Sequence, residues 1–218
     1  MRKFLWPLLI VGVGALMLGA CTQSDVWTAD FPIEKDELIS TGRNPYFILE
    51  PGYSLVLEGG DEQLTITVLS ETKTVDRVEE TRVVEERETK GGKLVEVSRN
   101  YFAMSRRTND VFYFGEDVDM YKDGQVVNHD GAWLSGVKDA KFGLVMPGRV
   151  LLNAGYYQET APKVALDRAK IVSMSETVKT PAGEFTNCLK VEETTPLKPR
   201  VTEFKYYAPA SDWCRRTC

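Results

Sequence analysis

Alternation of apolar and polar side chains constrains this chain most, because it recurs with a period of two between short glycine-containing turns. It runs through residues 53–57, stops at the Gly-Gly-Asp turn of residues 59–61 and resumes through residues 64–68. Such alternation is typical of strands with one buried face, and a short glycine turn between two of them predicts a β-hairpin.

The same pattern predicts further strands along the chain. They are expected at residues 78–103 around a Gly-Gly turn at 91–92, at 111–114, at 120–127 around Asp123-Gly124, after the turn at 180–183, and at 201–208. Residues 162–175 allow a helix beginning at Pro162, but we favour a strand from Arg168 onward. We therefore expect an all-β, mainly antiparallel domain over residues 44–209, a meander-like curved sheet or half-barrel with at most one or two short helices.

Glutamate and arginine are concentrated in residues 79–90, where they could belong to one face of a helix. Val83, Val84 and the threonines of this run favour a strand instead. The charged side chains would then cover a solvent-exposed face of the sheet. We expect them to form ion pairs across neighbouring strands.

The N-terminus has the layout of a secretory signal peptide, with Arg2 and Lys3 followed by an uncharged apolar stretch. Residues 18–21, Leu-Gly-Ala-Cys, resemble the bacterial lipobox, which predicts cleavage after residue 20 and lipidation of Cys21. Residues 21–43 are then a lipidated N-terminus and tether, with a docked turn around Trp27 and Phe31. An ordinary signal peptide followed by a chance cysteine is the alternative.

Lipidation would make a membrane the predicted partner, through the anchor at Cys21. Thr22 follows the cysteine, which favours the periplasmic face of the outer membrane if the host is Gram-negative. Loss of residues 1–20 removes two positive charges and changes the net charge from −5 to about −7. So acidic a domain is not expected to bind nucleic acid.

Few residues suggest chemistry. The chain has four cysteines and a single histidine, His129, which argues against metal sites with several imidazoles. Residues 116–124 lack the ligand spacing of a calcium loop. His129 is interpreted as a solvated loop residue, since the chain has no Gly-x-Ser-x-Gly nucleophile motif, and Cys188 as a semi-buried structural thiol. We predict no catalytic residue, metal or cofactor, and consider Trp133, Tyr156 and Tyr157 candidates for a ligand groove.

Five motifs carry a resemblance to a family. They are residues 44–53, 113–118, 145–148, 180–188 and 206–209. The chain resembles uncharacterised bacterial secreted proteins similar to the TapB-like families. That resemblance implies a curved antiparallel sheet related in shape to the lipoprotein carriers LolA and LolB, and it implies no catalytic residues.

The resemblance ends at Pro209. In such proteins Tyr-Tyr-Ala-Pro is followed by Gly-Ile-Gly-Leu-Val, or the same motif with Val second, and a further strand, whereas this chain continues with Ala-Ser-Asp-Trp-Cys. One added guanine before compatible codons for residues 210–214 restores the family sequence. We therefore interpret residues 210–218 as a frameshifted tail that replaces a final strand, with Cys214 and Cys218 as artefacts of the frame. The missing strand would leave an unpaired sheet edge.

These observations favour a lipid-anchored envelope protein with a non-enzymatic β domain that binds a ligand or scaffolds an assembly. The shape implied by the resemblance suggests an apolar or acyl ligand, and an envelope protein is a further candidate partner. A hydrolase of envelope polymers is the alternative, which two carboxylates facing one another in a groove would support. A purely structural surface component is the third possibility.

Overall fold

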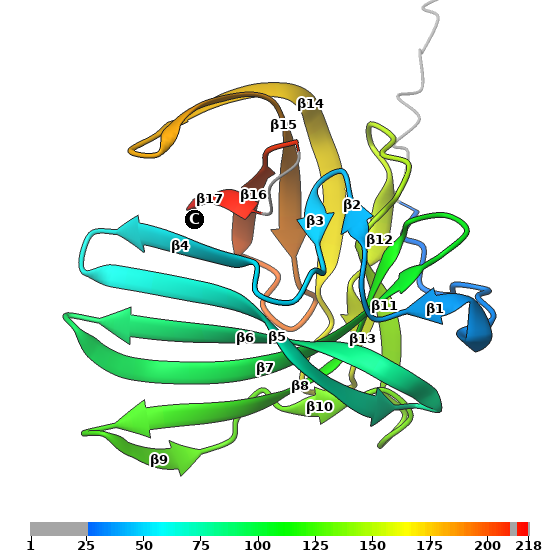
Figure 1. Cartoon of the computed structure of the whole chain (residues 1–218), viewed down its shortest axis with the longest axis horizontal. Helices are drawn as coiled ribbons and strands as arrows, with labels where there is room; N and C mark the ends of the chain where they lie inside the picture. Colours follow the sequence, from blue (N-terminus) through cyan, green and yellow to red (C-terminus); the bar gives the residue numbers. More distant parts are fainter. Residues whose placement is uncertain (1–25, 210–212, 218) are drawn as a thin grey trace, which may run out of the picture.

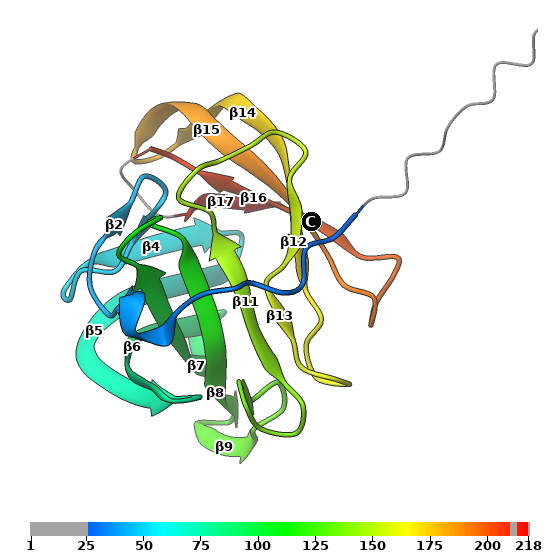
Figure 2. The same cartoon turned by 90° about the vertical axis from the view of Figure 1, so that its right-hand side faces the viewer.

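The computed structural model describes residues 26–209 and 213–217. The chain forms two main antiparallel sheets, of ten and five strands, and a small two-stranded ribbon. The five-stranded sheet arches over the larger one, so that the two enclose a common interior (Figures 1 and 2). The predicted all-β fold with a curved, half-barrel sheet is confirmed.

The larger sheet follows the order β13-β11-β8-β7-β6-β5-β4, with β1, β9 and β10 paired at its sides. Its strands are β1 (Leu38–Ile39), β4 (Ser54–Gly59), β5 (Glu62–Val75), β6 (Val78–Lys90), β7 (Lys93–Ser105), β8 (Val111–Lys122), β9 (Gln125–Asn128), β10 (Trp133–Leu134), β11 (Lys141–Met146) and β13 (Glu159–Thr160). Consecutive strands from β4 to β9 pair antiparallel. The hairpins predicted around the turns at residues 59–61, 91–92 and 123–124 are confirmed, and the pairings of β5 with β6 and of β7 with β8 are additional.

The smaller sheet follows the order β12-β14-β15-β16-β17. Its strands are β12 (Gly155–Tyr157), β14 (Arg168–Thr180), β15 (Gly183–Thr194), β16 (Thr202–Tyr207) and β17 (Trp213–Thr217), and the ribbon consists of β2 (Arg43–Asn44) and β3 (Phe47–Ile48). The strand expected from Arg168 is therefore confirmed. In the described part of the chain the one helix is a single 3₁₀ turn, η1 (Lys35–Glu37), and no helix there is long and apolar enough to cross a bilayer.

The end of the chain differs from expectation. Residues 213–217 form β17, which pairs antiparallel with β16 from Phe204–Thr217 to Tyr207–Trp213. The edge of β16 is covered, so the expectation of an unpaired edge is wrong. Backbone hydrogen bonding along a sheet edge depends little on side-chain identity, and a segment without apolar alternation can still supply it. The reading-frame hypothesis for residues 210–218 itself stays a prediction.

Apolar side chains of both sheets meet in one core. Phe112 and Phe114 of β8 are buried together with Ile171 of β14 and Leu189 of β15. Phe114 also stacks on Phe142, with ring centroids 4.8 Å apart. Because the core joins the two sheets, we describe them as one domain.

Residues 26–43 pack along this domain more extensively than the expected docked turn. The guanidinium of Arg168 lies 4.5 Å from the centre of the Trp27 ring, and Phe31 packs edge-on against Phe112 at 5.8 Å. Buried Arg82 donates hydrogen bonds to Ser40 O and Thr41 Oγ1 and so holds the segment against the sheet. The predicted signal peptide, residues 1–20, and Cys21 lie outside the described residues.

Candidate functional site

A cavity of about 230 Å³ lies between the two sheets. Residues of β3, β5, β6, β7, β8, β10, β11 and β13 line it from the larger sheet and the ribbon, and residues of β15 and β16 line it from the smaller sheet. The volume is far above what a single water needs but below that of most pockets for drug-sized ligands. The cavity therefore suits a small molecule.

One side of the cavity is a continuous aromatic wall, formed by Phe47, Phe102, Tyr113 and Trp133. Each ring contacts the next, with centroid distances of 5.1, 4.9 and 5.2 Å along the series. Trp133 is only 6% exposed, and its indole N–H has no hydrogen-bond partner among the described residues. A buried donor without a partner is costly to the folded state.

Two glycines allow the strands that carry this lining to approach closely. Gly115 has a φ of +133°, and a Cβ there would lie 2.3 Å from the carbonyl oxygen of Trp133. A Cβ at Gly143 would lie 2.5 Å from the backbone of Gln158. Side chains at these positions would push β10 and the segment before β13 away from the sheet, and with them Trp133 and Gln158.

Glu116 of β8 lines the cavity beside the aromatic wall. Burial and the neighbouring charge of Glu86 raise the pKa of Glu116 from its ordinary 4.5 to about 8, although a hydrogen bond with Tyr113 offsets part of the rise. The hydrogen of the Tyr113 hydroxyl is donated to Asn100 Oδ1 at 2.7 Å. Glu116 is therefore largely protonated near neutral pH and can donate a hydrogen bond or a proton.

Glu159 of β13 is the most deeply buried carboxyl of the cavity, with 3% exposure. Its Oε1 accepts the backbone N–H of Asp167 at 2.5 Å. Burial and the charge of Asp167 raise the pKa of Glu159 well above its usual range, despite that hydrogen bond. A second carboxyl with a raised pKa thus lines the same cavity.

The wall contributed by the smaller sheet carries a charged pair. Lys205 Nζ of β16 lies 2.7 Å from Glu193 Oε2 of β15, and Gln158 Nε2 donates to Glu193 Oε1 at 3.2 Å. Among the described residues that line the cavity, Lys205 is the one cation against five carboxyls. Those carboxyls are Glu86, Glu116, Glu159, Asp167 and Glu193.

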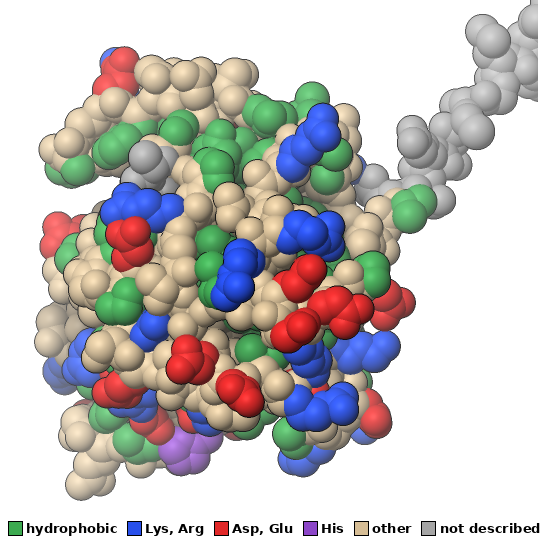
Figure 3. All heavy atoms as spheres, turned by 45° about the vertical axis from the view of Figure 1, so that its right-hand side comes forward, with side chains coloured by type: hydrophobic (Ala, Val, Ile, Leu, Met, Phe, Trp, Pro, Cys, Tyr) green, Lys and Arg blue, Asp and Glu red, His purple; other side chains and the backbone are tan. Residues whose placement is uncertain are grey.

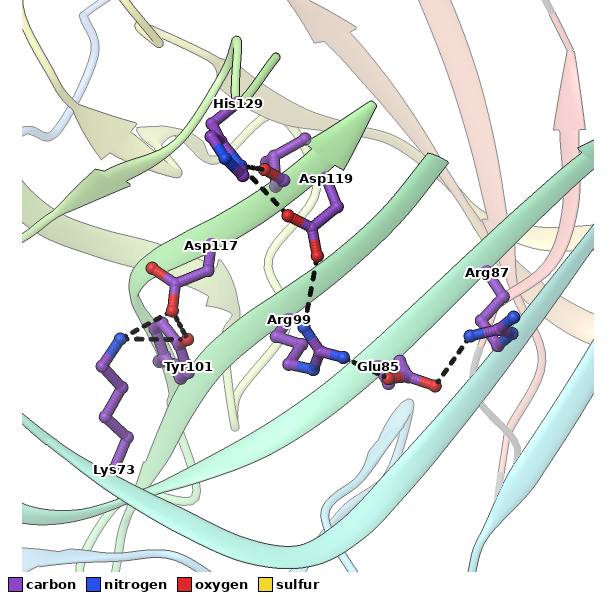
Figure 4. Close-up of polar contacts among 9 residues, drawn as sticks. Lys73, Glu85, Arg87, Arg99, Tyr101, Asp117, Asp119 and His129 are labelled. Atoms are coloured by element: carbon purple, nitrogen blue, oxygen red, sulfur yellow. Dashed lines mark hydrogen bonds and ion pairs between the residues drawn. The ribbon is translucent and has the colours of Figure 1, made fainter. Parts of the chain in front are cut away.

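The opposite face of the larger sheet carries charges that are paired. Arg99 of β7 contacts Glu85 of β6 at 3.3 Å and Asp119 of β8 at 3.6 Å (Figure 4). Asp117 accepts hydrogen bonds from Lys73 Nζ at 2.8 Å and from the Tyr101 hydroxyl at 2.5 Å. The predicted cross-strand ion pairs of this charge-rich region are confirmed.

The three residues considered for a ligand groove do not all meet. Trp133 lines the cavity, whereas Tyr156 and Tyr157 of β12 do not. Tyr156 is 3% exposed within the core, and its hydroxyl lacks a partner in the part of the chain that the structure describes. Tyr157 lies near Arg168, whose guanidinium is 6.0 Å from its ring centre.

His129 lies in an exposed loop, and Cys188 lies in the interior. The His129 side chain is 68% exposed, and its Nδ1 lies 3.0 Å from Asp119, not against its neighbour Asp130 (Figures 3 and 4). Cys188 is completely buried, more so than expected, and its Sγ contacts the carbonyl oxygen of Phe185 at 3.5 Å. Within the described residues no cluster of acidic, histidine or cysteine side chains could hold a metal ion.

Sequence reasoning missed Glu116 as a cavity residue because a β-bulge decides which way its side chain faces. The pairing of β7 with β8 shifts register between Asn100 and Phe102, so that Tyr113 and Glu116 come to share a face. Strict alternation would place these two residues on opposite faces. Gly115, whose φ is positive, is the one local signal of the bulge.

Comparison with known proteins adds no family. The chain matches no family model, no curated protein and no solved structure. The cavity and its lining are therefore the basis for a functional hypothesis.

Proposed function

We propose that this chain is a lipid-anchored envelope protein whose β domain binds a small polar ligand in the cavity between its two sheets. One observation carries the proposal: a wall of aromatic rings that ends in buried Trp133 lines the same cavity as two carboxyls with raised pKa, Glu116 and Glu159. Ligand sites combine apolar walls with a few converging polar groups, and this cavity has both.

The lining favours a polar ligand over an acyl chain. An acyl chain would contact the aromatic wall well but would offer no hydrogen bond to the carboxyls of Glu116 and Glu159 that line the same cavity. A buried polar atom left without a hydrogen-bond partner costs roughly 1–3 kcal/mol. A ligand with donors and acceptors of its own satisfies these groups while packing against the same wall.

The test is whether the purified full-length protein holds a ligand at this place. Denaturation followed by mass spectrometry should release a small polar molecule, and the indole N–H resonance of Trp133 should shift when that molecule is added back. Trp133→Phe should abolish retention, and Trp27→Phe, which alters a tryptophan packed on Arg168 instead, should not. Release of fatty acid would support the acyl-ligand version instead, and an empty cavity with a silent indole would refute binding.

A carboxylate-dependent hydrolase is the second candidate, because Glu116 and Glu159 have the raised pKa that a general acid needs. Glu193, held by Lys205, lines the same cavity and could act as the second carboxylate. Digestion of isolated envelope polymers by the full-length protein, lost in Glu159→Gln and in Glu193→Gln but retained in Asp117→Asn on the opposite face, would establish this function. No product from any polymer would leave binding as the better account.

The membrane anchor is a separate part of the proposal and rests on the lipobox at residues 18–21. Metabolic labelling with a tritiated fatty acid should mark the wild-type protein, and Cys21→Ser should be unlabelled and leave the membrane fraction. Cys188→Ser is the matched control and should stay labelled. Equal membrane retention of the Cys21→Ser protein would contradict the anchor. The kinship with TapB-like proteins likewise stays a prediction.

A further inference from the structure

We propose that the loop between β11 and β12 docks the domain on the phospholipid bilayer that holds its anchor, by inserting Leu151 and Leu152 into the bilayer surface. The inference rests on the proposed lipid anchor at Cys21 and goes beyond it, because an anchor alone leaves the domain free to turn about its tether. Three features carry it: two exposed leucines, the place where the N-terminal segment meets the domain, and the charge of the loop.

Leu151 and Leu152 are consecutive residues that project into solvent. They are 56% and 55% exposed, more than any other leucine in the described part of the chain. The backbone of their turn is held in place, because the Ala154 N–H donates to the carbonyl oxygen of Leu151 at 3.1 Å. The Asn153 N–H also donates to the carbonyl oxygen of Ile171 in β14, at 2.8 Å. A fixed turn that exposes two apolar side chains is typical of a surface that contacts a membrane or another protein.

The N-terminal segment meets the domain beside this loop. Thr28 forms a parallel bridge with Tyr156 of β12, and its N–H donates to the carbonyl oxygen of Gly155 at 3.0 Å. Two chains in a parallel pairing run in the same direction, so the chain before Thr28 comes from the same end of the domain as the chain before Tyr156, which includes Leu152. Val26, which is 84% exposed, therefore lies at the end of the domain that carries the loop (Figure 1).

The tether between the anchor and the domain is short. Val26 is only five residues after Cys21, and a fully extended chain of that length spans at most about 18 Å. A lipid on Cys21 would therefore keep this end of the domain close to the bilayer surface. Tethering raises the effective concentration of a second contact, so even a weak insertion of the leucines is favoured. The anchor thus brings a bilayer to the loop, which is why we choose it over a second copy of the chain.

The charge of the loop suits phospholipid headgroups, although the chain as a whole is acidic. Residues 142–158 contain Arg149 and no Asp or Glu, in a chain with a net charge of −5. Arg149 is exposed and forms no ion pair with a residue that the structure describes. Asp110, whose carboxylate reaches this segment, accepts the Gly148 N–H at 2.7 Å. Arg149 can bind a headgroup phosphate while its aliphatic stem stays beside the inserted leucines.

A second pair of exposed aliphatic residues provides a matched control. Val126 and Val127 of β9 are also consecutive, and they are 44% and 55% exposed. β9 lies at the opposite end of the domain from the loop between β11 and β12 (Figures 1 and 2). Exposure alone would make the two pairs equivalent, whereas the tether predicts that the bilayer contacts only the leucines.

The experiment uses the lipidated protein in nanodiscs of phosphatidylethanolamine and phosphatidylglycerol. Some of the lipids carry a nitroxide at the top of the acyl chains, which attenuates the NMR signals of nearby nuclei. We expect the methyl signals of Leu151 and Leu152 to lose most of their intensity. The methyl signals of Val126 and Val127 should keep theirs.

A double variant tests whether the leucines cause the docking. The amide signals of Asn153 and Ala154 should be attenuated in the wild-type protein. In the protein that carries both Leu151→Ser and Leu152→Ser they should recover most of their intensity, although the anchor remains. Changing both valines of β9 to serine should leave the attenuation as it is. The amide spectrum without nitroxide shows whether each variant is folded.

Four results would overturn the inference. Equal attenuation of the leucine and valine methyl signals would indicate a freely turning domain, and attenuation at Asn153 and Ala154 that survives the leucine changes would exclude the leucines as its cause. Leu151 and Leu152 signals that shift with protein concentration in the absence of lipid would indicate a second copy of the chain. These three results leave the anchor standing. An N-terminal peptide whose mass shows no lipid would overturn the anchor and the inference together, and none of the four bears on ligand binding in the cavity.

Discussion

Glu116 and Asp117 are consecutive carboxylates on β8, yet they lie in opposite environments. Asp117 faces the ion-paired side of the sheet, where hydrogen bonds from Lys73 and Tyr101 outweigh the effect of burial and lower its pKa. Glu116 faces the cavity, where burial and Glu86 raise its pKa to about 8. At these two positions the two faces of β8 thus have opposite effects on a carboxyl: one favours its charge and the other disfavours it.

The difference indicates which face of β8 contributes to stability and which to function. Charges on the outer face form ion pairs within the folded chain, so no ligand is required to balance them. The cavity keeps carboxyls in conditions that disfavour their charge, which a protein tolerates where a ligand or a reaction makes use of them. We consequently place the site on the face of β8 that carries Glu116.

Replacing Glu116 with Gln should have the largest effect of the changes considered. A carboxyl with a raised pKa stabilises the fold below its ordinary pKa of 4.5, and that stability is lost as the pH rises towards about 8. Each pH unit across this interval is worth about 1.4 kcal/mol. From about pH 5 to about pH 8 the wild-type protein should lose up to about 4 kcal/mol relative to Glu116→Gln.

Chemical denaturation at a series of pH values measures this difference directly. Glu159 remains in both proteins, so its own titration largely cancels in the comparison. Parallel curves for the wild-type and Glu116→Gln proteins would show that Glu116 ionises normally, and the contrast with Asp117 would be lost.

Replacing Asp117 with Asn should act in the opposite direction and more weakly. A carboxylate with a lowered pKa contributes stability above its ordinary pKa of 3.8 and loses it as the pH falls further. Since the side chain is 53% exposed, solvent screens the pair and the loss at neutral pH should be about 1 kcal/mol. The free energy of unfolding of the wild-type protein, the two single variants Asp117→Asn and Lys73→Met, and the double variant gives the interaction energy between Asp117 and Lys73. The measurement is made at neutral pH and near pH 3. An undiminished loss near pH 3 would show that packing, not charge, is responsible.

Local patterns account for what could be predicted of the fold. The hairpins from β4 to β9 depend on alternation and on turns such as Gly91-Gly92 and Asp123-Gly124, where positive φ angles are required. The packing of residues 26–43 depends on distant partners instead: Thr28 bridges to Tyr156, and Trp27 packs on Arg168. Single apolar residues in an irregular segment do not indicate which surface they contact.

The candidate site was harder to predict from the sequence, again because it depends on contacts between residues that are distant in the chain. Trp133 was a candidate because aromatic side chains often line ligand sites, and it does line the cavity. Glu116 shares a face with Tyr113 only because of the register shift in β8, and Glu159 belongs to a two-residue strand that no periodicity identifies. Nothing in the sequence places Glu116 and Glu159 in one cavity, because they are far apart in the chain. They come together because β11 pairs with β8 on one side and with β13 on the other.

Replacing Arg99 with Met tests the matched face with the smallest expected effect. Arg99 joins Glu85 and Asp119 at 3.3 and 3.6 Å, and its side chain is 40% exposed. Methionine keeps the packing of the aliphatic stem, so the change isolates the charge. We expect a loss of about 0.5–1 kcal/mol at low salt, which should shrink in about 1 M salt as the two carboxylates are screened. A larger loss that salt does not reduce would mean that these ion pairs are shielded from solvent. The two faces of β8 would then not differ in how well solvent screens their charges.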